Sequence, residues 1–179
     1  MRSMMYSEND SMSQYDMVVA YRVYPKISGN CGYFVDGSKF DLTKLCLDSF
    51  KSSLGDIKIK MIAILDRCPA EYEALFEEYF NEEDLEIVKL SEGGNRETFN
   101  LQLELLSEQQ YSDVVMLAED DYFYLPNTMS YAIKALNHER VDFITTYNHL
   151  DYYTMQLYNI NREYIFTDNM VWGRVGATT

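Results

Sequence analysis

Residues 57–65 have the sequence IKIKMIAIL, which is the clearest indication of fold class in this chain. The run begins with alternating apolar and charged residues and then becomes wholly apolar, as expected of a strand that enters the middle of a sheet. A second run, MVVAYRVY at residues 17–24, is rich in Val and Tyr and ends before Pro25. That composition also favours a strand.

Strand-like and helical patterns alternate along the rest of the chain. Five runs favour strands: residues 17–24, 57–65, 85–90, 114–118 and 141–147. Apolar residues recur at helical spacing in four segments: residues 42–54, 69–80, 96–110 and 126–136. This alternation predicts an α/β fold with three α/β/α layers and a mostly parallel central sheet. After Asn148 we expect a polar, hairpin-like stretch that contains several tyrosines.

Composition narrows the class of partner. Of the 179 residues, 15 are Lys or Arg and 29 are Asp or Glu, so the formal net charge is −14. Nucleic-acid binding needs clustered basic side chains, so we expect no nucleic acid as a partner. The three cysteines, Cys31, Cys46 and Cys68, are odd in number and widely spaced. They indicate neither a disulfide framework nor a zinc site.

The sequence also bears on domain organisation and location. No apolar run approaches the length of a membrane span, and residues 1–15 are polar, without the apolar centre of a signal peptide. We expect residues 1–15 to form a flexible leader and residues 16–179 to form one domain. The expected location is the cytoplasm, with peripheral attachment at a membrane as an alternative.

Three adjacent carboxylates follow the apolar run at residues 114–118. Glu119, Asp120 and Asp121 would lie at the carboxyl end of that strand, where open α/β sheets bind ligands. Adjacent carboxylates repel one another, and a hard divalent cation relieves the repulsion. The motif therefore predicts an Mg²⁺ or Mn²⁺ site that water and substrate phosphates complete. The alternative is a solvated turn with incidental acidic residues.

Two other segments would reach the same edge of the sheet. Asp66 ends the second strand, where it either accepts hydrogen bonds from a base or ribose or caps the helix that begins near residue 69. Gly93, Gly94, Asn95 and Arg96 follow the third strand. The glycines let the backbone approach a ligand and the polar residues supply donors, unless the segment is a plain turn.

Taken together, these segments resemble the nucleotide-sugar-dependent glycosyltransferases of the GT-A fold. The resemblance covers residues 16–147 and rests on VVAYRVYP, IAILDRC, GGNRETFNLQLELL and, above all, VVMLAEDDYFYLPNTM. The last segment looks like the acidic DXD metal motif of that family in its Glu-Asp-Asp form. The resemblance implies a metal-dependent transferase of the hexosyltransferase type. It would move a sugar from a nucleoside-diphosphate sugar, with a UDP-sugar as the expected donor, to a glycan or other acceptor.

The resemblance also implies roles for single residues. Asp121 would coordinate Mn²⁺ or Mg²⁺. The implied nucleotide-sugar-binding residues are Arg22, Pro25, Asp66, Asn95, Glu119 and Asp120. Glu119 and Asp120 would lie by the ribose and diphosphate, and Asp66 would meet the base. Asn95 would lie near the nucleotide, whereas Arg22 and Pro25 would border its pocket.

No catalytic base is assigned. Family members usually carry the base and acceptor contacts in a further segment, so we expect the C-terminal acceptor part to be incomplete, transfer to be slow or absent, and the chain to self-associate. If a base lies within these residues, the candidates are Asp142, His149, Asp151 and Asp168. Two alternatives stay open: a nucleotidyltransferase, which uses a similar sheet and acidic metal site, and a non-catalytic glycosyltransferase-like binding domain.

Overall fold

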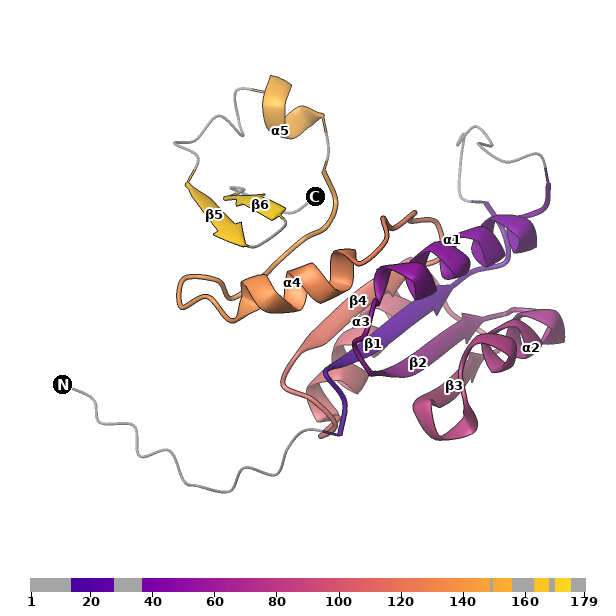
Figure 1. The fold of residues 1–179 in the computed structure, drawn as a ribbon. Coiled ribbons are helices and arrows are strands. Elements are labelled where there is room, and N and C mark those ends of the chain that lie inside the picture. Colours follow the sequence, from indigo (N-terminus) through magenta and orange to yellow (C-terminus); the bar gives the residue numbers. More distant parts are fainter. Residues whose placement is uncertain (1–13, 28–36, 149, 156–162, 168–169, 175–179) are drawn as a thin grey trace.

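A parallel four-stranded sheet lies at the centre of the chain (Figure 1). The computed structural model describes residues 14–27, 37–148, 150–155, 163–167 and 170–174. The strands are β1 (Met17–Val23), β2 (Ile59–Asp66), β3 (Leu85–Leu90) and β4 (Val115–Glu119). Their order across the sheet is β3-β2-β1-β4, and every neighbouring pair is parallel.

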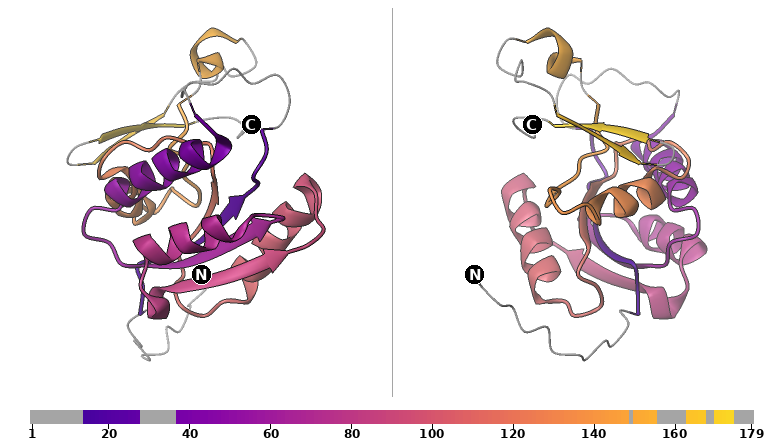
Figure 2. Two further views of the ribbon diagram at one scale, coloured as in Figure 1. Left: turned by 90° about the vertical axis from the view of Figure 1, so that its right-hand side faces the viewer. Right: turned by 60° about the vertical axis from the view of Figure 1, so that its left-hand side comes forward.

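Helices cover both faces of this sheet, as the alternating pattern predicts (Figure 2). The helices α1 (Lys39–Ser53), α2 (Ala70–Tyr79) and α4 (Thr128–Leu136) pack on one face, and α3 (Asn95–Glu108) packs on the other. A single 3₁₀ turn, Glu82–Asp84, precedes β3. The described part of the chain is therefore an α/β domain compatible with three layers.

The alternation of side chains along β1 explains why it lies inside the sheet. Val19 and Tyr21 face α1 and α2, whereas Val18 and Ala20 face α3, and all four side chains are fully buried. A strand buried on both faces needs an apolar residue at nearly every position, which is the pattern of β1 and β2. The apolar runs thus determine which strands lie in the middle.

The strand order creates a change of direction beside β1. The chain passes from β1 to β2 to β3 through α1 and α2, and then returns through α3 on the opposite face to place β4 along the other side of β1. In open α/β sheets, ligands bind outside the carboxyl ends of the strands where the order reverses. In this chain that position lies between the ends of β1 and β4.

Four of the five predicted strands are confirmed, and the fifth is wrong. Residues 141–147 form no strand, and the side chain of Phe143 is 91% exposed. The run is rich in β-branched and aromatic residues, but strand propensity needs a pairing partner to take effect. No described strand pairs with this segment, so β4 is an edge strand in the part of the sheet that the structure describes.

The C-terminal part forms a short helix and a hairpin. The helix α5 spans Asp151–Thr154, and β5 (Tyr164–Thr167) pairs antiparallel with β6 (Met170–Gly173). A hairpin was expected from the tyrosine-rich stretch, but Tyr152 and Tyr153 lie in α5, and Tyr158 lies outside the described residues. Strand β5 contacts α4, which connects the hairpin to the domain.

Two further observations concern the boundaries of the fold. Tyr15, which the sequence places in the leader, is 2% exposed, and its hydroxyl donates to the Glu83 carbonyl at 3.0 Å. The packed part therefore begins at or before this residue. No helix in the described ranges combines the length and apolar character needed to cross a membrane.

Replacement of Tyr21 by Phe tests the packing of the core. The Tyr21 ring lies edge-on to Phe50 and Phe76, and its buried hydroxyl has no hydrogen-bond partner among the described residues. We expect Tyr21→Phe to raise the free energy of unfolding by about 1 kcal/mol, because an unsatisfied buried hydroxyl is removed. Tyr15→Phe is the matched control and should lower it by about the same amount, since that hydroxyl is bonded. Urea denaturation measures both, and a loss of stability in Tyr21→Phe would show that the hydroxyl has a partner.

Candidate functional site

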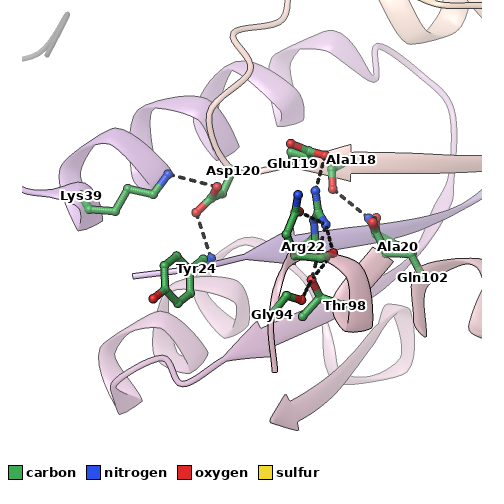
Figure 3. A network of polar contacts seen from close by, with 11 residues as sticks. Ala20, Arg22, Tyr24, Lys39, Gly94, Thr98, Gln102, Ala118, Glu119 and Asp120 are labelled. Atoms are coloured by element: carbon green, nitrogen blue, oxygen red, sulfur yellow. Dashed lines mark hydrogen bonds and ion pairs between the residues drawn. The ribbon is translucent and has the colours of Figure 1, made fainter. Parts of the chain in front are cut away.

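Arg22 joins three elements at the edge formed by the carboxyl ends of the strands (Figure 3). Its Nη1 donates to the backbone carbonyl of Asn95 at 2.9 Å and to Asn95 Oδ1 at 2.7 Å, and its Nη2 forms an ion pair with Glu119. Arg22 and Glu119 are also register partners of β1 and β4. The structure therefore brings together three residues that the sequence assigned to one site.

Glu119, the last residue of β4, and Asp120, which directly follows it, bind partners on opposite faces of the sheet (Figure 3). Glu119 turns toward Arg22 on the α3 side. Asp120 turns toward α1, where its Oδ1 lies 3.0 Å from Lys39 Nζ. Its Oδ2 accepts from the Tyr24 backbone N–H at 3.2 Å and from Thr43 Oγ1 at 3.3 Å. The two adjacent carboxylates thus bind two different parts of the fold.

The Asp120 carboxylate is buried inside the protein. The side chains of Asp120 and Lys39 are each only 10% exposed. Burial raises the pKa of Asp120, and the Lys39 ammonium and the Tyr24 N–H only partly oppose this rise. Both oxygens of Asp120 are occupied by protein groups, so this residue fixes the relative positions of β1, β4 and α1.

Asp121 differs from its two neighbours. It is exposed, and within the described part of the chain it forms no ion pair. No set of three or more His, Cys, Asp and Glu side chains that could enclose a metal occurs among the described residues. The donor chemistry fits an open site, in which one or two carboxylates hold Mg²⁺ or Mn²⁺ while water and phosphate supply the other ligands.

Asp66 lies at the end of β2 and is 3% exposed. The guanidinium of Arg67 binds it with two hydrogen bonds, Nε to Oδ1 at 3.0 Å and Nη2 to Oδ2 at 3.1 Å. The alternative that Asp66 caps the next helix is wrong, because the N-cap of α2 is Pro69 and no side chain bonds there. The carboxylate is instead engaged by its sequence neighbour.

The loop after β3 approaches Asp66 closely. A Cβ atom on Gly93 would lie 3.2 Å from Asp66 Oδ1, tighter than an ordinary contact. Glycine at this position therefore lets the loop pack against the end of β2. The loop leads into α3, whose N-cap, Gly94, supplies no side-chain cap, while Asn95 and Arg96 are exposed in the first turn. Backbone N–H groups of such a turn are donors for an anion.

Sequence reasoning missed Lys39 and Arg67. Lys39 opens α1, where Ser38 and Asp41 form a capping box that fixes the start of the helix. The sequence around Lys39 gives no sign that it pairs with Asp120, which lies 81 positions further along the chain. Arg67 directly follows Asp66, and that adjacency is a signal that could have indicated their pairing.

Pro25 and the candidate catalytic bases lie apart from these ion pairs or outside the described residues. Pro25 follows Tyr24 in a bend at the end of β1 and is partly buried. Of the candidate bases, Asp142 is exposed, His149 and Asp168 lie outside the described residues, and Asp151 opens α5. A shallow depression lined by Asn81, Glu82 and Glu83 lies before β3, at the opposite edge from the strand ends that carry the candidate site.

The described cysteines are not activated. Burial raises the pKa of Cys46 to about 11 and that of Cys68 to about 12. The thiolate is the reactive form of cysteine, so both thiols are protonated near neutral pH.

A comparison of the chain with known protein-family models and with curated proteins finds no match.

Replacement of Lys39 by Met tests the buried ion pair. It leaves Asp120 buried without its cation, and we expect the free energy of unfolding to fall by about 3–5 kcal/mol at pH 7. The loss should shrink as the pH is lowered, because the pKa of Asp120 rises further without Lys39 and protonation then removes the unpaired charge. Lys44→Met, on an exposed position of the same helix, is the control. Equal stability of the two variants in urea titrations would contradict the role of Lys39.

Thiol labelling tests the state of the cysteines. With Cys31 replaced by Ser, folded protein at pH 8 should react slowly with Ellman's reagent, because the thiols of Cys46 and Cys68 are protonated and partly or fully buried. Unfolding in guanidinium should release two fast-reacting thiols. Fast labelling of folded protein would mean that one of them is a thiolate.

Proposed function

We propose that the protein is a metal-dependent glycosyltransferase of the GT-A type that uses a nucleoside-diphosphate sugar. The observation that carries the proposal is the position of Glu119-Asp120-Asp121. The motif lies at the carboxyl end of β4, beside the end of β1, where the strand order reverses. This is the position at which open α/β sheets bind ligands, and the motif resembles the metal motif of that family.

The charge arrangement supports a cation-assisted mode of binding. The chain has a net charge of −14, and at this edge Arg22, Lys39 and Arg67 are already paired with carboxylates. Arg96 and Lys26 are exposed and form no ion pair among the described residues, but a chain this acidic still gains from additional positive charge beside a diphosphate. A divalent cation held by Asp121 would supply it and would stabilise the leaving diphosphate.

The neighbouring residues would contact the other parts of the nucleotide sugar or hold the site in place. Glu119 keeps its Oε2 available, since Arg22 engages Oε1 and the side chain is 39% exposed. This oxygen suits a ribose hydroxyl, which donates a hydrogen bond. Asp120 holds the ends of β1, β4 and α1 in place and so presents Asp121 to solvent. The N–H groups in the first turn of α3 and the side-chain amide N–H groups of the exposed Asn95 suit the phosphates.

The donor and acceptor follow from the resemblance and not from the geometry. A UDP-sugar is the expected donor and a glycan the expected acceptor. A nucleotidyltransferase would use a similar sheet and a similar acidic metal site, so an activity assay should test both reactions. Release of nucleoside diphosphate identifies sugar transfer, whereas release of pyrophosphate from a nucleoside triphosphate identifies nucleotidyl transfer.

Replacement of Asp121 by Asn tests the proposal. Wild-type protein should bind UDP more tightly with Mn²⁺ than with EDTA, and Asp121→Asn should weaken Mn²⁺-dependent binding by at least about tenfold. The melting temperature should stay unchanged, because Asp121 is exposed and unpaired in the described structure. Calorimetric titration measures the binding, and Asp113→Asn, exposed at the opposite end of β4, is the control. UDP binding that is indifferent to Mn²⁺ or to Asp121 would contradict the metal role.

A further inference from the structure

Arg67 has a backbone conformation that its side chain does not favour. Its φ is +54°, in the left-handed region where residues with a Cβ are uncommon. Its backbone N–H still donates to the Leu90 carbonyl at 2.8 Å, which continues the contact between β2 and β3. Such a conformation costs free energy and persists where the surrounding structure imposes it, often at functional sites.

The Arg67 side chain contacts the ends of two strands. Two guanidinium N–H groups bind the buried Asp66 carboxylate, one to each oxygen. The guanidinium carbon lies 5.0 Å from the centre of the Tyr24 ring, at the end of β1. The side chain is thus held by two hydrogen bonds to Asp66 and a cation–π contact with Tyr24, and it is still 45% exposed.

This arrangement leaves specific groups available to a ligand. A guanidinium carries five N–H donors, so three remain after the two bonds to Asp66. The group is planar, and guanidinium planes stack on aromatic rings. Asp66, in contrast, is 3% exposed, and the Arg67 fork engages each of its oxygens. Of these two neighbouring side chains, Arg67 is the one that can contact a flat ligand, and Asp66 is not.

We propose that Arg67 recognises the base of the nucleotide and that Asp66 is a positioning residue that holds Arg67. The proposal rests on the proposed function, because it names the specificity determinant of the same ligand site. A guanidinium donates hydrogen bonds and accepts none. It therefore favours a base that presents a carbonyl oxygen over one that presents an amino group at the same position. Uracil and cytosine differ in this way at one ring position.

The test compares UDP with CDP in the presence of Mn²⁺. Wild-type protein should bind UDP at least about tenfold more tightly than CDP, as expected for a polar group that must be satisfied on binding. Arg67→Lys should lose most of that preference, because an ammonium keeps the charge beside Asp66 but has neither the plane nor the fork. Arg140→Lys, an exposed arginine on the segment after α4, is the matched control and should keep the preference.

A second variant separates recognition from folding. Arg67→Gly combined with Asp66→Asn relieves the strained φ and removes the buried charge that would otherwise lose its partner. This double variant should fold with a melting temperature at or above that of Arg67→Lys and should bind UDP and CDP equally. Circular dichroism and calorimetry give the two readouts separately.

The outcomes distinguish the two proposals. If wild-type protein binds UDP with Mn²⁺ and both variants keep the UDP preference, Arg67 is only structural and the inference is overturned while the proposed function stands. Equal weakening of UDP, CDP and inorganic pyrophosphate in Arg67→Lys would place Arg67 at the diphosphate and would also overturn it. If wild-type protein binds neither nucleotide, both proposals fail.

Discussion

Parallel pairing of β1 with β4 is the contact on which the candidate site depends. The chain builds β1, β2 and β3 in one direction across the sheet and then uses α3 to cross to the opposite face and return. Only this return places an acidic strand end beside Arg22. Gln102 reinforces the contact, because its buried amide donates to the carbonyls of Ala20 at 2.8 Å and Ala118 at 3.1 Å (Figure 3).

Three ion pairs organise the edge of the sheet, two between residues that the fold brings together and one between sequence neighbours. Arg22 with Glu119, Lys39 with Asp120 and Arg67 with Asp66 each combine one carboxylate with one cation. Buried or partly buried pairs gain little net stability, since desolvation offsets much of the attraction. Their value lies in orientation, because each pair fixes the direction of a side chain at the end of a strand. Asp121, directly after two of these paired carboxylates, is exposed and forms no ion pair among the described residues.

The sequence predicts the strands better than the contacts between them. Apolar runs identify β1 and β2, because burial on both faces requires them, and the position of Glu119–Asp121 after an apolar run indicates the edge at which they lie. Propensity fails at residues 141–147, where the β-branched residues pair with no strand that the structure describes. Local sequence also cannot pair Lys39 with Asp120, since that contact depends on which face of the sheet each side chain occupies. The assignment of a residue as ligand contact or internal partner therefore needs the fold.

The divergence of Glu119 and Asp120 also constrains how the chain can fold and vary. A shift of one residue between β1 and β4 exchanges the two faces of the strand, so Glu119 would turn toward α1 and Asp120 toward α3. Each carboxylate would then lose its cation, and Arg22 and Lys39 would be left partly buried with unmatched charge. Misaligned pairing is penalised for this reason even where the apolar residues of β4 could slide. A residue inserted between α3 and β4 must accordingly be absorbed within that connecting segment, in which the Gln109 side chain bonds to Tyr111 and Ser112, and not by a shift of β4.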